Sequence, residues 1–324
     1  MNHIRYVFYW EACEKNPSQF IKEIKKVARL ADKWGLKVVY GSHQFHTSNS
    51  LDPKNGTGFP KQLFQDDVRI TYAQGGTTVD NAAKVWWTKW WNRNITDNEG
   101  NDRWRLYANF LKKVVKNVDK HESTLGYEIL NEPQVHSSDQ WSKIGKFNSF
   151  ITKELRKITD KTVIYSMNVP ISFNNPLIDL NPQSLAKMAP ISKKNVVFKI
   201  SVYGIPTRNT YQGDKLKILT EASRIENVPM YVGEWNEVSR EEKINENGNL
   251  MFHIDPTKSN LNQLKADKLV KEFEKLDVWG TAFWNWNYVS HLAPNFNIIK
   301  VTDAGHIQPT KYFRIVEKAI SISN

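Results

Sequence analysis

Short apolar runs alternate with amphipathic segments along the whole chain, and this alternation constrains the fold more than any other feature. Seven runs have strand character: 3–10, 37–43, 125–133, 162–168, 196–203, 229–235 and 279–286. Between them, apolar residues recur at spacings of three and four, as in Phe20, Ile24 and Val27. Further helices are predicted over 104–118, 144–158, 216–226, 264–276 and 311–320. Apolar strands separated by helices predict a parallel sheet covered on its faces.

Composition excludes several classes of protein. The 324 residues contain no repeat, low-complexity tract or linker, so we predict a single domain over 1–324. No apolar run approaches the ~20 residues of a membrane span. Cys13 is the only cysteine, which excludes an internal disulfide and a multi-cysteine metal cluster. The net charge of +11 comes from lysines spread through helical segments among acids. This pattern is typical of solvated helix faces and predicts no nucleic-acid partner.

The positions of polar residues separate the two folds that fit this alternation, a doubly wound sheet and a (β/α)8 barrel. No strand is followed by the glycine fingerprint of a dinucleotide site or by a P-loop. Instead, polar or aromatic residues stand at the carboxyl ends of different apolar runs, where a barrel gathers its catalytic groups. These residues are His43, Asn131, Glu132, Asn168, Tyr203, Glu234 and Trp284. We therefore predict an α/β fold of the (β/α)8 (TIM) barrel type.

Glu132 and Glu234 suggest glycoside hydrolysis. An isolated buried carboxylate is costly, so a glutamate that ends a buried strand is paired or functional. The two lie 102 positions apart, about three βα units of ~31 residues. Two carboxyl groups on one barrel face can protonate a leaving oxygen and attack the sugar or activate water. Pro133 disfavours the α region for Glu132 and predicts extended backbone there.

Several motifs, in order along the chain, resemble a known family. They are IRYVFYWEA, GSHQ, YEILNEP, SVYG, YVGEW and GTAFWNW. Together they resemble the retaining glycoside hydrolases of the cellulase family, family five of the (β/α)8 glycosidases, from Met1 to about residue 320. The stretch from VWWTKWW to YEILNEP is similar to the branch that contains endoglucanases and endoglycoceramidases. The resemblance implies a retaining endo-β-glycosidase that needs neither metal nor cofactor and acts on a β-linked oligo- or polysaccharide.

The resemblance also implies roles for individual residues. Glu132 would be the general acid/base and Glu234 the nucleophile, with Arg5 and Tyr203 holding the Glu234 carboxylate. Asn131 would bind the sugar 2-hydroxyl, and His43 would line the subsite of the cleaved sugar. Trp284, followed by a cis peptide, would form the platform beneath that sugar. The full set of expected substrate contacts is Arg5, His43, Asn131, Tyr203, Trp284, Trp235 and His291.

Simpler interpretations stand beside these roles. Arg5 could neutralise a structural carboxylate, His43 could be a hydrogen-bonded rim histidine, and Tyr203 could be a core tyrosine. Gln44, His46 and His291 fit supporting or loop positions, and Asn168 could cap a helix. The tryptophans at 86, 87, 90 and 91 fit either core packing or sugar stacking. Long connections at 44–101 and 236–262 are predicted to wall the substrate groove and to supply aromatic subsites.

Two features depart from the family pattern. Ser201 stands where the family carries a histidine, two positions before the strand tyrosine. Serine is shorter and cannot carry charge, which bears on sugar preference more than on reaction type. The family's first strand also has no counterpart, so we expect that the chain starts downstream of its natural start or that another segment closes the barrel. The same expectation leaves the compartment unknown, although the resemblance suggests secretion.

The interpretation that fits best is an endo-β-1,4-glucanase that acts as a monomer. The alternatives within the enzyme class are a glycolipid-directed endoglycosidase and a mannan-directed hydrolase. From another class, a carbohydrate-binding barrel without catalysis also fits. Both catalytic glutamates are present in the sequence, which favours an enzyme.

Overall fold

The computed structural model describes residues 2–53, 56–64, 77–96, 100–167, 180–204, 211–244, 250–287 and 297–321. It contains two compact units. The first is Met1–Lys199 with Glu221–Pro229, and the second is Ile200–Thr220 with Met230–Asn324. The chain passes from one to the other within strand β5 (Val196–Tyr203). The prediction of one domain over 1–324 stays a prediction.

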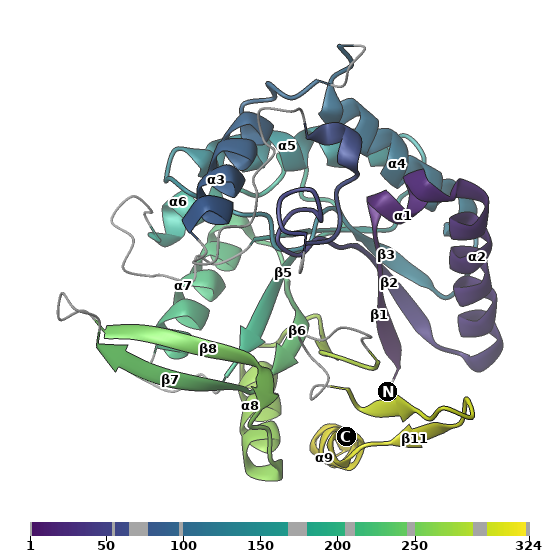
Figure 1. The fold of residues 1–324 in the computed structure, drawn as a ribbon, viewed down its shortest axis with the longest axis vertical. Coiled ribbons are helices and arrows are strands. Elements are labelled where there is room, and N and C mark those ends of the chain that lie inside the picture. The colour runs from purple at the N-terminus through teal and green to yellow at the C-terminus, as the bar shows by residue number, and fades with distance from the viewer. Residues whose placement is uncertain are drawn as a thin grey trace. The chain divides into compact units, whose positions relative to one another are not determined.

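The first unit is built on parallel strands. These are β1 (His3–Phe8), β2 (Lys37–Ser42), β3 (Thr124–Glu128), β4 (Thr162–Ser166) and the start of β5, each paired in parallel with the next. The helices of this unit are α1 (Trp10–Lys15), α2 (Pro17–Trp34), α3 (Thr77–Trp91), α4 (Arg103–Val118), α5 (Gln140–Leu155) and α6 (Pro182–Ala186), with the short 3-10 helix η1 (Lys61–Leu63). Helix α2 lies beside β1 and β2 in Figure 1, and it packs against α4, which in turn packs against α5.

Local sequence explains where these helices begin and end. Asn16 accepts a hydrogen bond from the Gln19 backbone and Pro17 occupies the first turn of α2, while Gly35 ends the helix with a φ of 65°. Asp102 caps α4 in the same way through the Trp104 backbone N–H. Side-chain acceptors at the N-terminus and a left-handed glycine at the C-terminus satisfy backbone groups that the helix leaves open.

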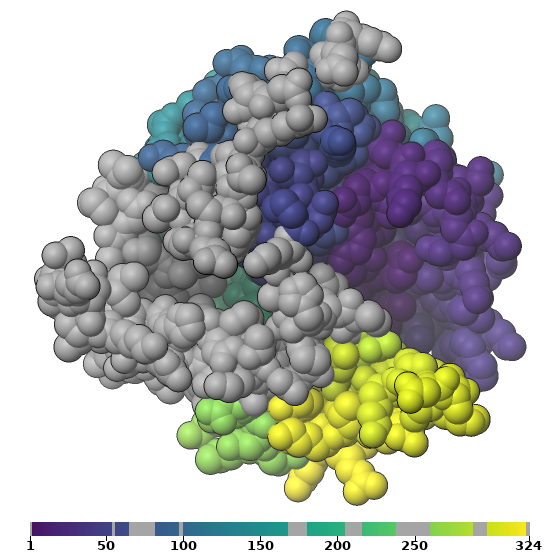
Figure 2. Space-filling model, viewed as in Figure 1, coloured from purple at the N-terminus to yellow at the C-terminus, as the bar shows by residue number. Residues whose placement is uncertain are grey.

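The second unit contains β6 (Met230–Asn236) and β9 (Gly280–Phe283), which pair in parallel. Its helices are α8 (Gln263–Lys275) and α9 (Lys311–Ser321), which pack together, and α7 (Tyr211–Glu226) begins in this unit. Two antiparallel pairs are added, β7 (Val238–Ile244) with β8 (Leu250–Ser259) and β10 (Ile299–Val301) with β11 (Ile307–Pro309). Strand β11 is exposed and belongs to the yellow surface in Figure 2.

The strand order confirms the predicted fold class. The seven strands follow one another as β1, β2, β3, β4, β5, β6 and β9, the order in which they occur along the chain. Parallel neighbours joined through helices form the succession of a (β/α)8 barrel, of which the described residues supply seven strands. All seven predicted strands are present, and so are the six predicted helices.

The two long connections contain regular elements that were not predicted from the sequence. Their role as walls of the substrate groove stays a prediction. The segment 44–101 contains helix α3, and the segment 236–262 contains the β7–β8 pair. The four tryptophans of α3 are at most 2% exposed, so they form core and not sugar subsites. Trp86 stacks on Trp90 and Trp87 on Trp91, one helical turn apart, with ring centroids 5.2 and 5.3 Å from each other.

Among the residues that the structure describes, no helix is long and apolar enough to cross a membrane. In the same residues, no group of three His, Cys, Asp or Glu side chains is arranged to hold a metal ion.

Candidate active site

The candidate residues fall into two groups, one in each compact unit. In the first unit, Asn131 and Glu132 lie three and four residues after Glu128, where β3 ends. The Asn131 N–H donates to the carbonyl oxygen of Ser42, at the end of β2, over 2.8 Å. The Glu132 N–H donates to Ser166 Oγ, at the end of β4, over 2.9 Å. Hydrogen bonds to the ends of both neighbouring strands therefore fix the segment that carries the proposed acid/base.

Gln44 holds the same segment from a third side. Its Nε2 donates to the carbonyl oxygens of Asn131 and Glu132 over 3.0 and 2.8 Å. Its Oε1 accepts from the Thr47 N–H over 2.9 Å. The three partner atoms in these contacts belong to the backbone. Gln44 thus supports the site without being a candidate for the chemistry itself, in agreement with its predicted supporting position.

The backbone of Glu132 is not extended, and the prediction made from Pro133 is wrong. The φ of Glu132 is 41°, in the left-handed region that non-glycine residues seldom adopt. Such a conformation persists where the surroundings fix it. Here Ser166 accepts from the Glu132 N–H while Gln44 donates to the Glu132 carbonyl, so both backbone groups are held.

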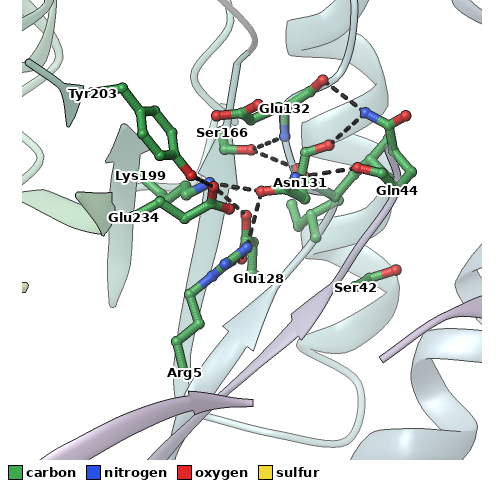
Figure 3. A network of polar contacts seen from close by, with 12 residues as sticks. Arg5, Ser42, Gln44, Glu128, Asn131, Glu132, Ser166, Lys199, Tyr203 and Glu234 are labelled. Atoms are coloured by element: carbon green, nitrogen blue, oxygen red, sulfur yellow. Dashed lines mark hydrogen bonds and ion pairs between the residues drawn. The ribbon is translucent and has the colours of Figure 1, made fainter. Parts of the chain in front are cut away.

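Buried charged residues lie beside Asn131 (Figure 3). Arg5 on β1 forms an ion pair with Glu128 at the end of β3, with 2.6 Å between Arg5 Nη2 and Glu128 Oε2. Lys199 on β5 lies 3.7 Å from Glu128 Oε1. The three side chains are at most 2% exposed. Arg5 Nη2 and Lys199 Nζ also donate to Asn131 Oδ1, over 2.9 and 2.6 Å.

Sequence reasoning missed Glu128 and Lys199, although a signal was present. Both stand inside apolar runs, YEILNEP and VVFKISVY, and a charged residue in a buried strand requires a partner. The partner, however, comes from another strand and cannot be read from spacing. The alternative interpretation of Arg5 was that it neutralises a structural carboxylate, and Glu128 is such a carboxylate. The predicted contact of Arg5 with Glu234 stays a prediction.

Gly41 makes room for this ion pair. It lies opposite Glu128 in the register of β2 and β3. A Cβ at this position would lie 2.8 Å from Glu128 Oε2 and 3.3 Å from Arg5 Nε. The lack of a side chain at residue 41 therefore leaves space for the ion pair between Arg5 and Glu128.

The second unit holds Glu234 and Tyr203. Glu234 stands on β6 and is 4% exposed. The Tyr203 hydroxyl, at the end of β5, donates to Glu234 Oε2 over 2.6 Å (Figure 3). A donated hydrogen bond stabilises the ionised carboxylate. The contact expected between these two residues is thus confirmed.

Trp284 follows β9, and its side chain is half-buried. The peptide bond from Trp284 to Asn285 is cis, as the family resemblance implies. Asn236, the last residue of β6, donates from Nδ2 to the Trp284 carbonyl oxygen over 2.6 Å. The backbone next to the expected sugar platform is therefore attached to the strand that carries Glu234.

Two of the remaining candidates are described by the structure. Trp235 is 0% exposed and packs edge-on against Phe283 and Phe273, with centroids 4.9 and 6.1 Å away. Its role as a substrate contact stays a prediction. His43 is 5% exposed and lies edge-on to Tyr9. Its role stays a prediction. His291 and Asn168 lie outside the described residues.

The loop that carries Glu132 rests on the aromatic core. Trp91 Nε1 of α3 donates to the Gln134 carbonyl oxygen over 2.9 Å. In the same loop, the His136 N–H donates to Gln140 Oε1 over 2.8 Å. Burial of the His136 ring, with a smaller contribution from the charge of Lys84, lowers the pKa of His136 to about 4. Near neutral pH the imidazole is therefore uncharged.

Sequence comparison identifies the family. Residues 1–290 match the family described as cellulase (glycosyl hydrolase family 5). The chain belongs to glycosyl hydrolase family 5. No curated protein matches its sequence.

Solved structures agree with this family 5 fold. Endo-glycoceramidase II from Rhodococcus sp., in complex with a five-membered iminocyclitol, has a TM-score of 0.67 at 13% identity, over 98% of this chain and 70% of that one. An endogalactoceramidase has a TM-score of 0.69 at 14% identity, over 99% and 72%. A triple mutant of an endo-β-1,4-glucanase from Xanthomonas axonopodis pv. citri has a TM-score of 0.55 at 14% identity, over 98% and 86%.

Proposed function

We propose that this family 5 member is a retaining endo-β-glycosidase that cleaves within β-1,4-linked glucans. The observation that carries the proposal is the hydrogen bond of 2.6 Å from Tyr203 to the buried Glu234 carboxylate. It favours the ionised form, which is the form that a nucleophile needs. The hydrogen-bonded placement of Glu132 supports its assignment as the partner acid/base.

The reaction proceeds in two displacements. Glu132, as the carboxylic acid, protonates the glycosidic oxygen while a Glu234 carboxylate oxygen attacks the anomeric carbon, and the bond to the leaving group breaks. A covalent glycosyl–enzyme results. Glu132, now a carboxylate, then takes a proton from water as that water attacks the anomeric carbon and releases Glu234. Two inversions give a product with the β configuration of the substrate.

Neighbouring residues supply binding and orientation. Asn131 would hold the 2-hydroxyl of the reacting sugar, a contact that strengthens in the transition state. Trp284 would stack beneath the same ring, since flat aromatic faces suit the apolar face of a sugar. No step of this account requires a metal or a cofactor.

A glycolipid-directed endoglycosidase is the second candidate. The observation in its favour is that two ceramide-glycan hydrolases have this fold over at least 98% of the chain. Such an enzyme would cleave a β-glycosidic bond next to a lipid with the same two glutamates. The proposed mechanism therefore holds for both candidates, and only the leaving group differs. Mannan hydrolysis would likewise change the sugar and keep the chemistry.

A substrate panel tests the proposal. Product release is measured from soluble β-1,4-glucan, β-mannan, lactosylceramide in detergent micelles, and an aryl β-cellobioside. The wild type is compared with Glu234→Gln and with the control Glu23→Gln, whose side chain is exposed on α2. We expect release from the glucan and the cellobioside, unchanged in the control and lost in Glu234→Gln. Release from lactosylceramide alone would favour the second candidate. Sugar binding without turnover by the folded wild type would indicate a non-catalytic barrel.

A further inference from the structure

Lys199 stands at an unusual place for a lysine. It lies in the middle of β5, the run VVFKISVY, and is 0% exposed. Removing an ammonium group from water costs several kcal/mol unless good partners replace the water. The described partners are Asn131 Oδ1 at 2.6 Å and Glu128 Oε1 at 3.7 Å. The shorter contact is therefore to a neutral amide that is itself a candidate for substrate binding.

The hydrogen bonds of Asn131 fix which way its amide faces. An amide oxygen has two acceptor sites and the amide nitrogen has two N–H donors. Arg5 and Lys199 occupy both acceptor sites of Oδ1. Neither cation can donate to an NH2 group, so the flipped amide would face two cations with its own donors. One N–H of Nδ2 donates to the Gln44 carbonyl oxygen over 3.2 Å. Among the residues that the structure describes, the second N–H has no partner and can serve as a donor for a ligand.

Arg5 alone would not hold the amide as firmly. Arg5 Nε and Nη2 are directed to Glu128 Oε2, over 2.7 and 2.6 Å, and its contact to Asn131 uses the same Nη2 at 2.9 Å. Lys199 supplies the shorter bond to Oδ1 from a different strand. Bonds from β1 and from β5 therefore converge on one oxygen, and both donors are charged, which makes such bonds about twice as strong as neutral ones.

Position on β5 links Lys199 to the departure from the family pattern. Residues 199, 201 and 203 share one face of the strand, because side chains alternate. The family's histidine position on this face holds Ser201, which is 6% exposed and carries no charge. Lys199 is then the cationic residue that this face of β5 brings to the site.

We propose that Lys199 is a positioning residue, which holds the Asn131 amide so that its free N–H is presented to the 2-hydroxyl of the substrate sugar. This inference rests on the proposed function. It adds a residue outside the predicted set, and it assigns to the charge of Lys199 the orientation of the donor.

A pair of substrates with and without the 2-hydroxyl isolates this role. The kcat/KM values are measured for an aryl β-glucoside and for the same compound without the 2-hydroxyl of the reacting sugar. The proteins compared are the wild type, Lys199→Met, Asn131→Ala and the variant that carries both substitutions. Methionine is also unbranched and only one atom shorter, and it removes the charge and the hydrogen-bond donor. We expect the ratio of the two values to fall by about tenfold or more in Lys199→Met, since a hydrogen bond to a charged group is lost. The double variant should match Asn131→Ala.

The control is Lys161→Met. Lys161 is also partly buried in the first unit, but it donates to the carbonyl oxygens of His121, which precedes β3, and of Thr124, the first residue of β3. Its loss should leave the substrate ratio unchanged. Should Lys199→Met not fold, the ratio is read in Lys199→Gln, which keeps a neutral donor and is expected to show a smaller fall.

The outcomes separate the two proposals. An active wild type with an equal loss for both substrates in Lys199→Met would mean a merely structural lysine and would overturn the inference. A folded wild type that hydrolyses neither substrate would overturn the proposed function instead. In that case the NMR signals of the Asn131 side-chain amide decide the inference. A single slowly exchanging pair in the wild type that is shifted in Lys199→Met supports it, and an unchanged pair contradicts it.

Discussion

The hydroxyl of Tyr203 lies 2.6 Å from Oε2 of Glu234, so a residue at the end of β5 holds the carboxylate at the end of the next strand, β6. Both residues belong to one compact unit. The contact gives Glu234 a fixed rotamer and a donor that favours its charged form. The proposed nucleophile is therefore oriented before any substrate binds, and this relationship can be tested directly.

Replacing Tyr203 with phenylalanine should slow catalysis without unfolding the protein. A hydrogen bond to a charged group is worth about 1.5–3 kcal/mol, so we expect kcat/KM to fall about 10- to 100-fold. The acidic limb of the pH profile should move to higher pH, because protonated Glu234 becomes easier to form. Tyr6→Phe on β1 is the matched control. Equal activity of Tyr203→Phe and wild type would show that the contact does not serve the nucleophile.

The tryptophans of α3 should contribute stability and not substrate affinity. Trp87 is 0% exposed, and its Nε1 donates to Thr47 Oγ1 over 2.8 Å. We expect Trp87→Ala to lower the free energy of unfolding by about 3–5 kcal/mol, measured by chemical denaturation. Trp34 is 69% exposed on α2, so Trp34→Ala should change the free energy of unfolding by less than ~0.5 kcal/mol. A stable Trp87→Ala with weakened sugar binding would favour stacking instead.

Gly41 should tolerate no side chain. A Cβ would lie 2.8 Å from Glu128 Oε2, inside contact distance. Overpacking of this kind is expected to cost Gly41→Ala about 1–3 kcal/mol of unfolding free energy. The cost should shrink in a Glu128→Ala background, since the colliding oxygen is gone. Strictly additive effects of the two substitutions would contradict the assigned contact.

The lowered pKa of His136 predicts that the folded protein loses stability in mild acid. Its pKa is about 4 in the folded chain, below the ordinary value of 6.5, because its ring is buried. The unfolded chain therefore takes up the proton first. The stability contributed by the neutral ring is full above pH 6.5 and is lost as the pH falls towards 4. We expect His136→Gln to flatten the dependence of the unfolding free energy on pH in this window, compared with wild type and with the exposed-site variant His306→Gln. An unchanged slope would show that the ring titrates normally.

Periodicity predicted the strands and most helices because each buries one continuous apolar face. Helix α3 was missed because its tryptophans at 86, 87, 90 and 91 lie within a long connection whose other residues are mostly polar. The β7–β8 pair was missed because VSREEKI, the sequence of β7, has too many charges to indicate a strand. Regular spacing of apolar residues identifies elements that bury one face against the sheet. Neither α3 nor the β7–β8 pair shows that spacing clearly.

For the site, motifs placed the two glutamates but not their surroundings. YEILNEP and YVGEW marked Glu132 and Glu234 at strand ends. The left-handed backbone of Glu132 could not be predicted, because it depends on Gln44 and Ser166 from distant parts of the chain. The pairing of Glu128 with Arg5 and Lys199 likewise joins three strands. A sequence shows which charged residues are buried, whereas the fold decides which of them meet.

Chemical rescue tests the central claim most directly. Glu132→Ala and Glu234→Ala are each incubated with an activated aryl β-glycoside and sodium azide, and the glycosyl azide is analysed by NMR. In a double displacement, azide intercepts the glycosyl–enzyme of Glu132→Ala from the β face and gives a β-azide. In Glu234→Ala, azide enters from the vacated nucleophile side and gives an α-azide. We predict this pair of products. The same anomer from both variants, or an α-azide from Glu132→Ala, would contradict the roles assigned to the two glutamates.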